Sequence, residues 1–61
     1  MKLEFDPLAD AAYLEISNAD VEKSQEIQPG IIADYDAQGK MVGIEILYVS
    51  KRNATPLKKA A

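Results

Sequence analysis

The residues of this chain that could do chemistry are concentrated in one short acidic segment. Asp34, Asp36 and Gln38 alternate along it, followed at once by Gly39 and, six residues further on, by Glu45. An EF-hand calcium loop has the same spacing: oxygen ligands at its first, third and fifth positions, Gly at its sixth and a bidentate Glu at its twelfth. The spacing alone therefore indicates coordination of a hard divalent cation.

The flanks of this segment argue against a calcium site. An EF-hand loop lies between two helices, but the Pro-Gly pair at residues 29–30 interrupts any incoming helix, and the residues after it favour a strand. In a hairpin, Asp34 and Asp36 flank the turn, whereas Glu45 lies roughly 20 Å down the return arm at about 3.4 Å per residue. One ion could not reach both ends, so we expect no metal and no cofactor. Asp36 is expected to accept hydrogen bonds from its own loop amides, and Gly39 to adopt the left-handed conformation.

Other catalytic chemistry has few residues to work with. The chain contains no Cys and no His, so it lacks thiol nucleophiles and the side chain that most often carries acid–base catalysis near neutral pH. Asp6 and Asp10 fit turn roles, and so small a chain has little room for a substrate cleft. We therefore expect a protein that is not an enzyme. The alternative is a metal-binding or metal-dependent hydrolytic module built on the acidic turn.

The elements that must position these residues are predicted to be strands, beginning with an N-terminal pair. Polar and apolar residues alternate over residues 2–5 and 11–16, which predicts two antiparallel strands joined by the turn that Asp6 begins. A helix over residues 8–15 is the competing interpretation, because Ala and Leu favour helices. That helix would make the fold α+β.

The rest of the chain predicts three more strands. Residues 21–28 are mostly polar, as in an exposed edge strand, and residues 31–35 pair with residues 41–49 in a hairpin that turns at Gly39. Both faces of this hairpin are partly apolar, so we expect another molecule to cover one of them. The predicted fold is mainly β, an antiparallel sheet of about four to five strands. The candidate interface residues are Ile32, Met41, Ile44, Leu47 and Tyr48.

Size and termini set the domain organisation. We expect one domain over residues 1–52 and a basic tail over residues 53–61, with a short helical turn at residues 57–61. A domain this small is marginally stable alone and has no Cys for disulfides, so we expect a homodimer or another complex. No stretch resembles a signal peptide or a membrane span, which predicts a cytoplasmic protein.

The charge distribution predicts the chemistry of a partner. Residues 1–50 carry ten acidic residues against three lysines, a net charge of −7, and the remaining residues carry +4. An acidic body repels nucleic acid and attracts basic proteins. The basic tail lacks an element that could read a base sequence, so we do not expect nucleic-acid binding.

Two blocks of sequence resemble a known family. They are FDPLADAAYL at residues 5–14 and PGIIADYDAQGKMVGIEIL at residues 29–47, and they are followed by Ser50-Lys51-Arg52. They resemble the family called domain of unknown function 2283, whose members are small β-rich proteins of bacteria and archaea without an established activity. Members are often encoded beside a small basic protein that looks like a ribonuclease-type toxin.

The resemblance implies an antitoxin-like partner of a small basic toxin, which agrees with the acidic charge. The chain shows no helix-turn-helix pattern, so a repressor role is not expected. We therefore expect a non-enzymatic protein-interaction domain. A purely structural subunit of a homo-oligomer is a further alternative.

Overall fold

The computed structural model describes residues 1–52, which form one sheet and a short helical turn. The strands are β1 (Lys2–Asp6), β2 (Ala11–Glu15), β3 (Lys23–Gln28), β4 (Ile31–Tyr35) and β5 (Met41–Ile46), and a 3-10 helix, η1 (Val49–Lys51), follows them. The helical turn expected at residues 57–61, like the rest of the tail, lies outside the described residues. The prediction of a mainly β fold is confirmed.

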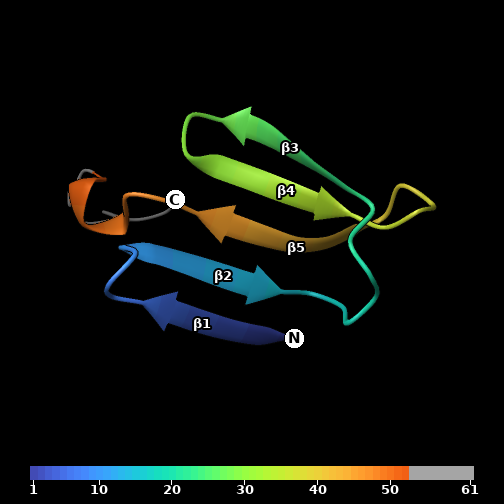
Figure 1. Ribbon diagram of the computed structural model, residues 1–61, viewed down its shortest axis with the longest axis horizontal. Helices are drawn as coiled ribbons and strands as arrows, with labels where there is room; N and C mark the ends of the chain where they lie inside the picture. The colour runs from blue at the N-terminus through green and yellow to red at the C-terminus, as the bar shows by residue number, and fades with distance from the viewer. Residues whose placement is uncertain (53–61) are drawn as a thin grey trace, which may run out of the picture.

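The five strands form a single antiparallel sheet in the order β1-β2-β5-β4-β3. Two pieces that are local in sequence, β1–β2 and β3–β4–β5, meet where β5 pairs with β2, as Figure 1 shows. The alternative helix over residues 8–15 is wrong, because β2 occupies most of that segment. Pairing with strands on both sides outweighs the helix preference of Ala and Leu.

The strand register separates the side chains onto two faces of opposite character. Leu3 is opposite Leu14, and Ile44 is opposite both Leu14 and Ala33, so these four residues share one face. We call this surface the apolar face; by the same register it contains Leu3, Phe5, Ala12, Leu14, Ile31, Ala33, Ile44 and Ile46.

The other surface, the acidic face, is defined by the alternate residues of the same strands. Glu4 is opposite Tyr13, Tyr13 is opposite Glu45, and Glu45 is opposite Ile32. Side chains alternate between the two faces along each strand, which assigns the remaining members. The acidic face contains Lys2, Glu4, Asp6, Tyr13, Glu15, Glu26, Ile32, Asp34 and Glu45.

The sheet of residues 1–52 is a single layer with a very small core. Extensive contacts between its elements all join strands that are neighbours in the sheet. Among hydrophobic residues of the described part, only Ala33 and Val42 are buried, whereas Leu3 and Phe5 are 69% and 55% exposed. A sheet normally buries its hydrophobic face against a second layer. This chain does not provide that layer from its described residues.

The last strand is shorter than the sequence suggested. It ends at Ile46, because Tyr48 adopts a left-handed backbone conformation with φ 56° and begins η1. The prediction of a strand over residues 41–49 was therefore wrong at its C-terminal end. Strand β3 likewise begins at Lys23 rather than at residue 21.

The shorter β5 also divides the candidate interface residues. Ile44 lies on the apolar face and Ile32 on the acidic face, while Leu47 and Tyr48 follow the end of the sheet. Met41 is the first residue of β5, at an irregularity in the register with β4. The five residues therefore do not form one continuous surface.

Candidate functional site

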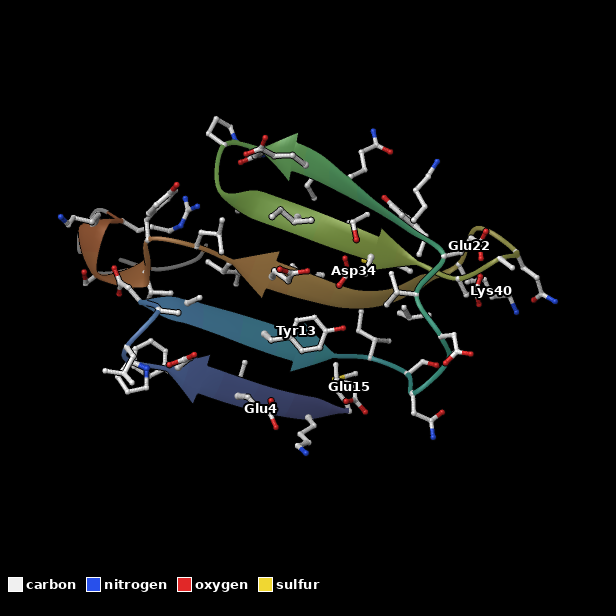
Figure 2. The ribbon with its side chains drawn as sticks, in the orientation of Figure 1. Glu4, Tyr13, Glu15, Glu22, Asp34 and Lys40 are labelled. Atoms are coloured by element: carbon white, nitrogen blue, oxygen red, sulfur yellow. The ribbon has the colours of Figure 1, made fainter. Side chains whose placement is uncertain are left out.

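The centre of the acidic face is a tyrosine that lies across a glycine. Tyr13 extends from β2 over Gly43 of β5, so that a Cβ atom at Gly43 would overlap the Tyr13 hydroxyl. Glycine permits this close approach because it has no side chain, and the ring covers backbone that would otherwise be bare. Figure 2 shows Tyr13 on the same side of the sheet as Glu4, Glu15 and Asp34.

Asp34 is the one buried charged residue of the described part, with 3% of its surface exposed. Its Oδ1 accepts a hydrogen bond of 2.6 Å from the hydroxyl of Ser24, which β3 places directly opposite. A buried carboxylate without a partner would be costly, so this bond is a condition for placing Asp34 in the middle of the sheet.

Two titratable groups beside Asp34 have altered pKa values. Burial raises the pKa of Glu45, and the neighbouring Asp34 carboxylate raises it further. Burial is also the main cause that raises the pKa of the Tyr13 hydroxyl, followed by the negative charge of Asp34. Both shifts favour the protonated form, so the surroundings disfavour adding negative charge to this cluster.

The prediction that Asp34 and Glu45 lie far apart was wrong. Asp34 is the fourth residue of β4 and is opposite Gly43, so Glu45 lies only two residues further along the neighbouring strand and on the same face. The error came from placing Asp34 at the turn. Asp36 does lie in the turn, beyond the strand that carries Asp34. Residues 1–52 contain no group of three or more acidic side chains arranged to hold a metal ion.

The turn between β4 and β5 has the structure expected from its sequence. Asp36 Oδ1 accepts hydrogen bonds from the backbone N–H groups of Gln38 and Lys40 at 2.8 and 2.9 Å. Gly39 has φ 84°, a conformation that suits glycine. The acidic turn is therefore held by its own amides, with Asp36 satisfied locally.

An open groove runs along the acidic face beside Tyr13. It has a volume of about 850 Å³ and reaches from the β1–β2 turn across the sheet. Carboxylates from three strands line it, together with the tyrosine ring and apolar side chains. Its lining includes Glu4, Asp6, Tyr13, Asp34, Glu45 and Leu47.

Asp6 and Asp10 have different tasks. Asp6 Oδ1 accepts hydrogen bonds from the amides of Leu8 and Ala9 at 3.0 and 3.3 Å, as a turn residue does. Asp10 adopts φ 56°, and its carboxylate accepts hydrogen bonds from the backbone N–H and the hydroxyl of Ser50 at 2.9 and 2.8 Å. Its carbonyl also accepts from the N–H of Val49 at 3.0 Å. Sequence reasoning assigned Asp10 to a local turn and missed this long-range link.

Arg52 is a second residue whose role the sequence did not reveal. Its guanidinium donates to the carbonyl oxygens of Leu47 and Pro29 at 3.1 and 3.0 Å, which ties the end of the described chain to the β3–β4 turn. A Cβ atom at Gly30, which has φ 78°, would press on the Arg52 side chain. Asp10 and Arg52 together explain why the Ser50-Lys51-Arg52 segment is part of the folded unit.

The fold and this surface define a small single-sheet β protein with one apolar face and one acidic face. Residues 2–50 match the family described as protein of unknown function (DUF2283), and the chain belongs to this family. Searches of curated proteins and of solved structures gave no significant match. No helix within residues 1–52 has the length and hydrophobicity needed to cross a membrane.

Proposed function

We propose that this chain is a protein-interaction domain, acting by binding rather than by catalysis, and that its acidic face binds a small basic protein. The observation that carries the proposal is the strand register, which places carboxylates from all five strands on one face of the sheet. These are Glu4, Asp6, Glu15, Glu26, Asp34 and Glu45, against Lys2 as the basic residue of that face.

The distribution of charge favours a basic partner. Lys2 is already paired with Glu4 at 3.2 Å, which leaves the excess of carboxylates uncompensated by the described residues of that face. Complementary charge speeds encounter and rejects acidic partners, although it adds less to affinity than buried contacts do. Nucleic acid and acidic proteins would be repelled by this surface.

The groove beside Tyr13 favours recognition of a protruding basic side chain. A tyrosine ring can pack against an arginine or lysine side chain, and interface tyrosines combine apolar contact with a polar tip. Glu4 and Glu45 lie along the same groove and could accept hydrogen bonds from a guanidinium group. The finer proposal is an antitoxin-like role, in which a small basic toxin is held and neutralised on this face.

The test uses the protein encoded by a small basic reading frame next to the gene for this chain. That protein is purified and titrated into the full chain, and binding is measured by calorimetry. We expect binding that weakens as salt is raised from about 50 to about 300 mM, because exposed charge pairs are screened. Two acidic-face variants, Glu4→Lys and Glu15→Lys, are expected to weaken binding at least tenfold.

The matched control is Glu22→Lys, which changes the net charge equally in the segment before β3. Figure 2 shows Glu22 beside Lys40 on the β3 side of the sheet, whereas Glu4 lies on β1, the opposite edge strand. Equal weakening by all three variants would mean that overall charge, not the acidic face, governs binding. No binding at low salt by any neighbouring basic product would contradict the proposal.

A further inference from the structure

The apolar face is a broad hydrophobic surface that residues 1–52 leave uncovered. Four of the five strands contribute to it, and its outer members on β1, Leu3 and Phe5, are mostly exposed. The extensive contacts between described elements all join neighbouring strands within the sheet, so no described element packs extensively across this face. A sheet with one hydrophobic face is stable when that face packs on another layer.

Charge decides which molecule could provide that layer. Two copies of the chain repel each other, because each carries a net charge of −3, with −7 over residues 1–50. On the apolar face, strands β1, β2, β4 and β5 contribute no charged side chain, so two copies can approach there without bringing carboxylates together. Lys23 of β3 shares a face with Tyr35, and its ammonium lies 5.8 Å from the centre of that ring, at the rim of the patch.

The dimensions of the molecule suit such a contact. The described residues extend 36, 32 and 21 Å along their principal axes, with the turns and the 3-10 helix included, so the two longer extents are an upper bound on the broad face. A stable interface buries about 800 Å² per partner, with an apolar centre and a polar rim. The strands themselves cover roughly 20 by 20 Å, at about 4.8 Å between strands and about 3.4 Å per residue, so an interface of that area would use the whole face and its adjoining turns. The side chains at its centre, Leu14 and Ile44, pair across β2 and β5 and are only partly buried within one chain.

We propose that the apolar face is covered by the apolar face of a second copy of this chain. The two five-stranded sheets would stack about 10 Å apart in a two-layer sandwich, as packed sheets do. Leu14 and Ile44 of each copy would form the shared core, with Leu3 and Phe5 extending it. The acidic faces would point outward on opposite sides, so the dimer would present two independent sites of the kind proposed above.

The first measurement is sedimentation equilibrium of the full-length wild-type chain, with urea unfolding at several protein concentrations. We expect a dimer whose unfolding midpoint rises with concentration, because the folded state is linked to association. A folded monomer with a concentration-independent midpoint would overturn the proposal.

Two variants separate contact through the face from pairing through a strand edge. Leu3→Lys changes a residue of the edge strand β1, whereas Ile31→Lys changes a residue of β4, which lies inside the sheet. We expect both to weaken dimerisation at least tenfold, and Glu4→Gln, which makes the same change of net charge on the other face, to leave it unchanged. Loss with Leu3→Lys and retention with Ile31→Lys would indicate edge pairing instead and would overturn the proposal.

An experiment on the wild-type chain covers the case in which the variants fail to fold. In a mixture of isotope-labelled and unlabelled chains, we expect nuclear Overhauser effects between the Leu14 and Ile44 methyl groups of different copies. Their absence from a dimeric sample would contradict face-to-face packing. The alternative is that the chain's own tail covers the apolar face. A monomer that Leu57→Asp destabilises would support this alternative and would equally overturn the proposal. We do not expect that result, because the nine-residue tail has Leu57 as its one large apolar residue and is a poor cover for so broad a surface.

Discussion

At the scale of single residues, the pairing of Tyr13 with Gly43 is the most constrained feature of the acidic face. The ring occupies the space that a side chain at position 43 would need. Gly43→Ala must therefore displace Tyr13, and we expect a loss of about 1–3 kcal/mol in the free energy of unfolding, typical of overpacking. Urea unfolding at one protein concentration measures it.

The double variant Tyr13→Ala/Gly43→Ala provides the control for this mechanism. Once the ring is removed, an alanine at position 43 has space, so the cost of Gly43→Ala should largely vanish in the Tyr13→Ala background. Additive effects of the two substitutions would show that the ring is not what excludes a side chain there.

Glu45 gives the fold a specific pH dependence. Because burial and the Asp34 carboxylate raise its pKa above the ordinary 4.5, the folded chain holds this proton at pH values where the unfolded chain has released it. The stability that the protonated Glu45 carboxyl contributes is therefore lost as the pH rises from 4.5 through the raised pKa of the folded state. We expect the free energy of unfolding to increase as pH falls from 7 into this range.

The test of that assignment is Glu45→Gln, which mimics the protonated carboxyl. The variant should be more stable than wild type at pH 7 and should lack the gain on acidification, as measured by urea unfolding across a pH series. Glu4→Gln, at an exposed position of the same face, serves as the control and should keep the gain. An unchanged pH profile in Glu45→Gln would rule out this carboxyl as its source.

At the scale of elements, the sheet has two halves that are joined in the middle and fastened at one end. The β2–β5 pairing makes the join, and the hydrogen bonds from Ser50 and Val49 to Asp10 fasten the end, where Figure 1 shows η1 beside the β1–β2 turn. Asp10 therefore links positions forty residues apart.

Substitution of Asp10 tests this link. Asp10→Ala removes both acceptor oxygens and places an alanine at φ 56°, and we expect it to cost about 1–3 kcal/mol of unfolding free energy. Asp10→Asn keeps one carbonyl oxygen and tolerates the left-handed conformation, so it should lose less. Asp10→Gly relieves the backbone but keeps no acceptor; if it were as stable as wild type, the hydrogen bonds to Ser50 would be unimportant.

The sequence predicted the strands well and their long-range contacts poorly. Period-two alternation placed β1, β2 and β4 within one residue of their observed ends, because alternation reflects a local property, the burial of one face of a strand. The end of β5, the Asp10 link and the Arg52 contacts depend on atoms far away in the chain. The Asp34–Glu45 contact was missed because Asp34 was placed at the turn, whereas it lies within β4, opposite Gly43 and close to Glu45.

At the scale of the whole molecule, net charge opposes the compact state. The described residues carry ten acidic side chains against five basic ones, a net charge of −5, and they contain one ion pair, Lys2–Glu4, between exposed side chains. Added salt should therefore screen repulsion more than it weakens attraction. We expect the thermal midpoint to rise between about 20 and about 500 mM sodium chloride at fixed protein concentration. A falling midpoint would mean that attractive pairs dominate.

The sequence also indicated at this scale that the chain needs further burial. The small size and the lack of Cys predicted that the chain needs burial against another molecule. The uncovered apolar face of residues 1–52 is the surface where that burial is expected. From the sequence, both faces of the last hairpin were expected to be partly apolar and to need cover, with Ile32 and Met41 among the candidate interface residues. In the sheet, Ile32 lies among carboxylates, so one face is apolar and the other is not.

The position of β5 between β2 and β4 governs when the protein can fold during synthesis. A nascent chain can form the β1–β2 and β3–β4 hairpins early, but an isolated two-stranded ribbon is only marginally stable in water. The six residues of β5 then complete two strand pairings at once, and they are the last of the five strands to leave the ribosome. Folding is therefore expected after β5 has emerged, so chaperones that bind exposed Leu and Ile side chains meet an unassembled sheet until that moment.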